Sequence, residues 1–154
     1  MGIEIERKFL VADGGWRDAA DPGTVMKQGY LAAEPERTVR VRVAGDQAWL
    51  TIKGPTDGAV RAEYEYPVPV VDAEAILELC ATTVVHKTRH RVPHGEHVWE
   101  VDVFAGENDR LVLAEVELTR ADEVIDLPDW LGAEVTDDHR YSNSQLSRRP
   151  YNRW

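Results

Sequence analysis

The sequence predicts an α+β fold built around an eight-stranded antiparallel β-barrel, and three observations favour it. Apolar and charged residues alternate along most of the chain, as at 3–9 and 39–43, and a period of two is typical of strands. Turn-forming pairs such as Gly45-Asp46 and His94-Gly95 separate these runs by only a few residues, which favours antiparallel neighbours. Eight such runs, each with an apolar and a charged face, are enough to close a barrel.

The alternating runs define the expected strands. They lie near residues 3–11, 24–33, 37–44, 47–54, 60–69, 82–93, 96–105 and 110–119. Because the connections are short, most neighbours in sequence are expected to be neighbours in the sheet.

Three segments interrupt the alternation and are predicted to be helical. From Asp72, a plausible N-cap, apolar residues recur at helical spacing at Ala73, Ile76, Leu77 and Cys80. A short helix is expected after Thr119, ended by Pro128, and another over 137–147, ended before Pro150. Cys80, the single cysteine, is interpreted as a small buried apolar residue, and no disulfide or cysteine metal cluster is expected.

The apolar strand faces cannot all point to solvent, so we expect helices and loops to cover them on the outside of the barrel. The charged faces then point inward. Burying that many charges is costly unless they are paired and hydrated. The pattern therefore predicts a tunnel with a charged interior that holds water and a ligand.

Length and charge limit the functional class. The chain has 154 residues and a net charge of −10, which predicts one domain over 1–147 and argues against a nucleic-acid binder. No apolar run is long enough to span a membrane, so a cytoplasmic protein, monomeric or homodimeric, is expected. The basic tail at 148–154 is expected to fray rather than to plug a tunnel mouth.

The inward faces carry balanced charge. The cations are Lys8, Arg40, Arg42, Lys53, Lys87, Arg89, Arg91 and Arg140. The carboxylates are Glu4, Glu6, Glu63, Glu65, Glu100, Asp102, Glu115 and Glu117. Carboxylates are the ligands of hard divalent cations and guanidinium groups bind phosphate oxygens in pairs, so we expect a site for metal ions and a small polyanion. The alternative is an ordinary wet sheet face of mixed charge, which six charged strands make improbable.

The same residues resemble a known family. Glu4-Ile5-Glu6-Arg7-Lys8 matches the Glu-x-Glu-x-Lys motif of the CYTH superfamily, the triphosphate tunnel metalloenzymes. Further segments follow in the family's order: 28–31, Arg40-x-Arg42, Lys53, Glu63-x-Glu65, Lys87-x-Arg89, Glu100-x-Asp102, Glu115-x-Glu117, 130–132 and 140–143. The chain is most similar to small bacterial members, over nearly its whole length.

The resemblance implies hydrolysis of inorganic triphosphate in a tunnel with Mg²⁺ or Mn²⁺, two ions per loaded site. Expected substrate-binding residues are Lys8, Arg40, Arg42, Lys53, Lys87, Arg89 and Arg140. Expected metal ligands are Glu4, Glu6, Asp102, Glu115 and Glu117, supported by Glu63, Glu65 and Glu100. Alternatives are a class IV adenylate cyclase, a nucleoside or thiamine triphosphatase, and a non-catalytic triphosphate or polyphosphate sensor.

Two smaller interpretations concern single residue types. The resemblance maps the family's Lys–Tyr dyad onto Lys53 and Tyr30. If cations crowd Lys53, the lysine would lose its proton and help activate water. The alternative is that Lys53 only binds phosphate. His86, His90 and His94 alternate with the inward cations, so they are expected to face away from the tunnel rather than to bind zinc.

Overall fold

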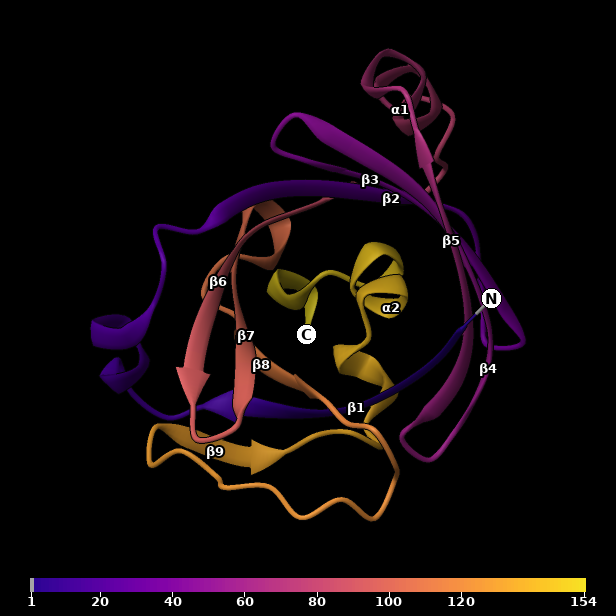
Figure 1. Cartoon of the computed structure of the whole chain (residues 1–154). Coiled ribbons are helices and arrows are strands. Elements are labelled where there is room, and N and C mark those ends of the chain that lie inside the picture. Colours follow the sequence, from indigo (N-terminus) through magenta and orange to yellow (C-terminus); the bar gives the residue numbers. More distant parts are fainter. Residues whose placement is uncertain (1) are drawn as a thin grey trace.

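The computed structural model describes residues 2–154 and confirms the barrel. The strands are β1 (Gly2–Val11), β2 (Thr24–Glu34), β3 (Arg37–Ala44), β4 (Gln47–Asp57), β5 (Val60–Val68), β6 (Val85–His94), β7 (His97–Ala105), β8 (Val112–Glu117) and β9 (Leu131–Glu134). The sheet order is β5-β4-β3-β2-β6-β7-β8-β1-β9. Because β5 also pairs with β1, the first eight strands form a closed ring, seen down its axis in Figure 1.

β1 closes the barrel by dividing its pairing between two strands. Its first half, Gly2–Ile5, pairs with β5, and its second half, from Glu6 to Leu10, pairs with β8. Every pairing in the ring is antiparallel. Two predicted hairpin turns rely on glycine, since Gly45 and Gly95 adopt φ values of 61° and 60°, a region that other residues rarely occupy.

A ninth strand was not predicted. β9 pairs with β1 at Phe9 and Val11, after the pairing of β1 with β5 has ended at Ile5. Its four residues, Leu-Gly-Ala-Glu, are too short to show an alternation, so nothing in the pattern separated them from a loop.

The helix predictions were partly wrong. α1 (Val70–Leu77) begins right after Pro69, so the predicted N-cap Asp72 lies inside its first turn. No helix follows Thr119; instead the Glu123 carboxylate accepts hydrogen bonds from the Thr119 amide and hydroxyl and pairs with His97, which holds this segment against the β6–β7 hairpin. A segment this short gains little from helical hydrogen bonds alone.

The helix predicted at 137–147 is two pieces. A 3-10 turn at His139–Tyr141 precedes α2 (Asn143–Arg148), and extended Ser142 separates them. The Ser142 hydroxyl accepts a hydrogen bond from the Gln145 amide, a usual N-cap contact. The remaining 3-10 turns lie at Gly15–Ala19, Gly106–Asn108 and Tyr151–Arg153.

Apolar clusters cover the outside of the barrel, as expected. Ala73 and Leu77 of α1 pack on Val41 and Val43 of β3 and on Ala48 of β4. A second cluster joins the outer faces of β1, β6, β7 and β8 to Trp16 and Trp130, which come from connecting segments.

A third cluster lies inside the ring. Val85, Phe104 and Leu113 share the inward parity of the charged residues on β6, β7 and β8, and they pack on Leu146 of α2. Figure 1 shows α2 and the C-terminus within the ring of strands. The interior is therefore charged over part of its length and apolar where the C-terminal segment fills it.

The tail does not fray, contrary to expectation. The Tyr151 amide donates to Asn108 Oδ1 over 2.8 Å, and the Trp154 ring packs edge-on against Tyr141 and Tyr151, with centroids 5.0 and 4.9 Å apart. The prediction failed because the sequence could not show that the aromatic residues of the tail contact Tyr141 and each other.

Candidate functional site

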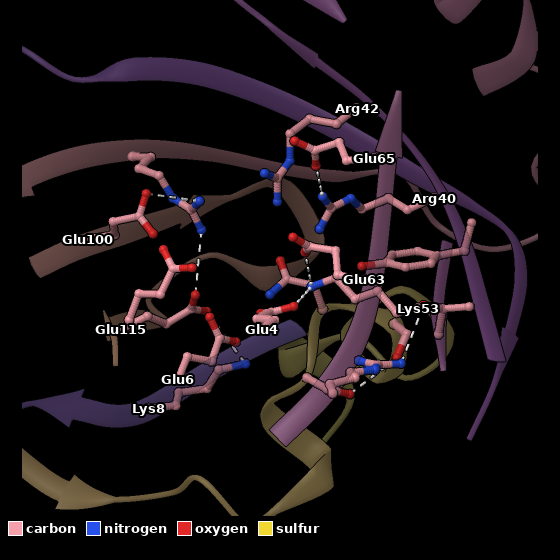
Figure 2. Close-up of a pocket in the computed structure, with 18 residues that line it drawn as sticks. Glu4, Glu6, Lys8, Arg40, Arg42, Lys53, Glu63, Glu65, Glu100 and Glu115 are labelled. Atoms are coloured by element: carbon pink, nitrogen blue, oxygen red, sulfur yellow. Dashed lines mark hydrogen bonds and ion pairs between the residues drawn. The ribbon is translucent and has the colours of Figure 1, made fainter. Parts of the chain in front are cut away.

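One cavity of about 250 Å³ collects charged side chains from β1, β3, β4, β5, β6, β7 and β8. Its charged lining residues are Glu4, Glu6, Lys8, Arg40, Arg42, Lys53, Arg61, Glu63, Glu65, Arg89, Glu100, Glu115 and Glu117. Figure 2 shows the labelled side chains converging on a common space. Six cations thus face seven carboxylates, which confirms the expectation of an inward, nearly balanced set.

Two arginines of β3 reach the cavity with different partners. Arg40 is held by Thr51 at 3.1 Å and Glu65 at 3.5 Å. Arg42 Nε donates to the amide oxygen of Gln28 over 2.7 Å, and no ion pair within residues 2–154 involves Arg42. Burial, together with Arg40 and Arg89, lowers the pKa of Arg42 to about 9. An anion entering the cavity would stabilise the charged form of Arg42, because it supplies the opposite charge that Arg42 lacks.

Lys53 lies among carboxylates rather than cations. Its Nζ is 2.6 Å from Glu4 and 3.4 Å from Glu63. The expected crowding of Lys53 by cations is therefore wrong, since its nearest charged partners are carboxylates. Tyr30 also lines the cavity, but its hydroxyl accepts a hydrogen bond from Gln28, and none within residues 2–154 joins it to Lys53.

Five of the seven cavity carboxylates lie on the neighbouring strands β1, β7 and β8, and the other two lie on β5. The register places Glu6 directly opposite Glu117, and Glu115 directly opposite Glu100, and like charges in such pairs destabilise a sheet. Burial and the carboxylates of Glu115 and Glu4 raise the pKa of Glu6 well above its usual range. Burial likewise raises the pKa of Glu100.

Two carboxylates nearby have cationic partners. Burial alone would raise the pKa of Glu4, but Lys53 and side-chain hydrogen bonds with Glu6 and Glu63 together outweigh it, and the net shift is downward. The pKa of Glu115 is lowered for the same reason, since Lys8, 3.5 Å away, and Arg89, 3.7 Å away, outweigh its burial. Glu6 and Glu117 lie opposite each other, and no ion pair within residues 2–154 involves either of them. A cation bound here would offset their repulsion, and its ligands would come from Glu4, Glu6, Glu115 and Glu117.

No three acidic, imidazole or thiol side chains in the described chain are gathered closely enough to hold a metal ion by themselves. Mg²⁺ is commonly held by one or two carboxylates with phosphate oxygens of a substrate and waters. The residues present therefore fit a metal that binds together with a polyanion.

The cavity lining lacks three predicted site residues, Lys87, Asp102 and Arg140, and the predicted inward cation Arg91. Lys87 and Asp102 are buried behind the cavity wall, 2.8 Å apart, and Asp102 also receives two hydrogen bonds from Arg89. Arg140 is exposed and pairs with Asp138 at 2.7 Å, outside the cavity. Arg91 is exposed beyond the cavity on β6. Parity placed the first two on the correct face but could not give their depth.

The cavity also holds residues that were not predicted as part of a site. Arg61 shares the inward parity of Glu63 and Glu65, a signal that was available. Thr38 and the C-terminal residues Ser142, Asn143 and Ser144 complete the lining. The resemblance covered 140–143, but it did not show that Ser142 and the start of α2 fold back into the barrel.

The histidines of β6 lie outside the cavity, as predicted. His90 Nδ1 donates to the Asp21 carbonyl oxygen and the ring packs on Trp16, and His94 lies 3.1 Å from Asp126. His86 is exposed. Within residues 2–154, no helix has both the length and the apolar character needed to cross a membrane.

Comparison with known proteins gives consistent results. The CYTH domain model matches residues 2–151. The inorganic triphosphatase of Acetivibrio thermocellus is 46% identical over 152 residues, covering 98% of this chain and 97% of the relative. The inorganic triphosphatase of Nitrosomonas europaea is 37% identical over 149 residues, covering 94% and 96%.

A solved structure agrees with the sequence comparison. The crystal structure of the inorganic triphosphatase NE1496 is 35% identical, with a TM-score of 0.66 over 96% of this chain and 95% of that one. The closed barrel, the ordered motifs on its inner face and the match over residues 2–151 together show that the chain belongs to the CYTH family.

Proposed function

We propose that the chain hydrolyses inorganic triphosphate to pyrophosphate and phosphate, with a divalent metal ion bound beside the substrate. The observation that carries this proposal is one cavity in which six Lys and Arg side chains face seven carboxylates. The two relatives described above, both named inorganic triphosphatase, support it.

The cavity suits a small polyanion better than a nucleotide. Its volume of about 250 Å³ falls below the ~300–1,000 Å³ common for pockets that bind drug-sized molecules. Among the described residues, Tyr30 is the single aromatic side chain that lines it, and Tyr30 is buried and bonded to Gln28. A nucleobase or a thiazolium ring would have little to stack on, which disfavours the cyclase and the nucleoside and thiamine triphosphatases.

Phosphoryl transfer to water requires charge neutralisation, an in-line water and stabilisation of the leaving oxygen. Arg40, Arg42 and Arg61 would bind phosphate oxygens with planar guanidinium groups, and Lys8 and Lys53 would act as point charges. Glu4, Glu6, Glu115 and Glu117 would hold Mg²⁺ or Mn²⁺, which when bound neutralises phosphate charge and acidifies water. The acidic residues also argue against a non-catalytic sensor, which would need only the cations.

Arg89 faces the cavity, and the buried pair of Lys87 and Asp102 behind it supports the site indirectly. Because Asp102 holds Arg89 through two bonds of 2.8 and 2.9 Å, the guanidinium has a fixed position at the cavity wall. We infer that Asp102 orients Arg89 and that Glu115, which faces the cavity, is the better metal ligand.

A phosphate-release assay tests the proposal. Tripolyphosphate, ATP and thiamine triphosphate are each incubated with Mg²⁺, Mn²⁺ or EDTA, and released phosphate and pyrophosphate are measured. We expect tripolyphosphate to give the highest kcat/KM and EDTA to abolish turnover. Preferred hydrolysis of ATP, formation of cyclic AMP, or tight binding of tripolyphosphate without turnover would each contradict the proposal.

A further inference from the structure

A buried hydrogen-bond chain connects two cavity arginines through the C-terminal segment. Arg42 Nε donates to Gln28 Oε1 over 2.7 Å, and Gln28 Nε2 donates to Asn143 Oδ1 over 2.9 Å. From the other side, Lys87 Nζ donates to the same Asn143 oxygen over 3.0 Å and to Asp102 over 2.8 Å. Asp102 in turn accepts a hydrogen bond from Arg89 Nε over 2.8 Å.

The chemistry of the partners fixes which way the two amides point. Arginine donates hydrogen bonds and does not accept them, so the atom of Gln28 that faces Arg42 must be its oxygen. The Gln28 nitrogen then faces Asn143, so the Asn143 atom that meets Gln28 and Lys87 must also be an oxygen. A reversed Asn143 amide would set its N–H groups against two other donors.

This orientation leaves the Asn143 nitrogen on the cavity side. Asn143 lines the cavity, its oxygen is held by Gln28 and Lys87, and no hydrogen bond within residues 2–154 uses Nδ2. Gln28 and Lys87 are almost fully buried, so they hold the amide from the side away from the cavity and do not line the cavity themselves.

We propose that Asn143 is a substrate-binding residue, which donates an Nδ2–H hydrogen bond to a phosphate oxygen, and that Gln28 and Lys87 are positioning residues for it. The inference rests on the proposed function and adds a neutral donor to its charged groups. A neutral donor suits this cavity, because it binds phosphate without disturbing the balance between six cations and seven carboxylates.

The decisive variant is Asn143→Asp. One carboxylate oxygen keeps the hydrogen bonds from Gln28 and Lys87, so the fold is retained, while the other replaces a donor with a negative charge facing the phosphates. We expect the Kd and KM for tripolyphosphate to rise at least about tenfold, since a hydrogen bond to a charged group contributes ~1.5–3 kcal/mol. The control is Gln145→Glu, which makes the same chemical change two residues away at a side chain outside the cavity; it should bind and turn over as the wild type does.

A direct measurement complements the variants. The ¹⁵N side-chain amide signals of Asn143, identified by their loss in Asn143→Asp, should shift when tripolyphosphate is added in EDTA, where no turnover is expected. Asn143→Asp with wild-type Kd and KM, or unshifted Asn143 signals at saturating tripolyphosphate, would overturn the inference while leaving the proposed function intact. A wild-type chain that binds but never cleaves tripolyphosphate would overturn the function alone, and one that does not bind it would overturn both.

Discussion

The buried lysine behind the cavity gives a prediction that needs no substrate. The Lys87 ammonium is fully buried, and although Asp102 is 2.8 Å away, burial and the charges of Arg89 and Arg42 lower its pKa from 10.5 to about 7. Glu115 is the other charged group that acts on it, and it favours the proton. The folded chain therefore holds this proton less tightly than the unfolded chain does.

The sign and size of the effect follow from linkage. Between pH 7 and 10.5 the unfolded state binds more protons at this lysine, so the free energy of unfolding rises as pH rises. The slope from one group is at most about 1.4 kcal/mol per pH unit. Between pH 7.5 and 9.5 this amounts to about 2–3 kcal/mol, or about 1 M in the urea midpoint for an m-value of ~2 kcal/mol/M.

The assay compares urea unfolding of the wild type with Lys87→Met, which retains an apolar chain of similar length. Titrating groups distant from Lys87 are shared by both proteins and cancel in the difference. Arg42, whose pKa is about 9, is also present in both proteins. The wild type should gain stability from pH 7.5 to 9.5 relative to Lys87→Met, whatever the offset between them. Lys27→Met, which removes a partly exposed lysine paired with Glu74, should keep the wild-type slope. Parallel profiles for wild type and Lys87→Met would refute the reasoning.

Three further changes test other parts of the structure. Arg42→Lys keeps the charge but loses the planar fork, so KM for tripolyphosphate should rise about tenfold in steady-state assays; an unchanged KM would mean that Arg42 does not touch substrate. Lys53→Ala should raise KM with little change in kcat, because Glu4 and Glu63 hold the amine at the cavity wall, where it can contact phosphate; a fall in kcat above about a hundredfold at constant KM would instead indicate action on water. Trp154→Ala removes two edge-on aromatic pairs worth ~0.5–1.5 kcal/mol each, so calorimetry should show Tm lower by about 2–12 °C; an unchanged Tm would mean that the tail adds no stability.

The faces of the strands were predictable because their cause is local. Successive side chains of a strand point to opposite faces whatever surrounds them. The alternation therefore predicted correctly that Glu4, Arg40, Lys53 and Glu115 all point into the barrel, where they line one cavity. The outer apolar clusters followed from the same alternation. What failed were segments without a period: β9, the stretch after Thr119, and the tail.

Depth along the barrel axis was not predictable, because it depends on a segment distant in sequence. Along β6 the inward residues run from apolar Val85, packed on Leu146, through buried Lys87 and cavity-lining Arg89 to exposed Arg91. Each step is two residues, roughly 7 Å, so a single strand crosses from the filled end of the lumen to its open end. The same alternation therefore produces a packing residue, a buried charge, a ligand-facing cation and a surface charge, and the C-terminal segment decides which position receives which environment. Any change that shifts α2 along the axis should alter which of these cations the substrate meets.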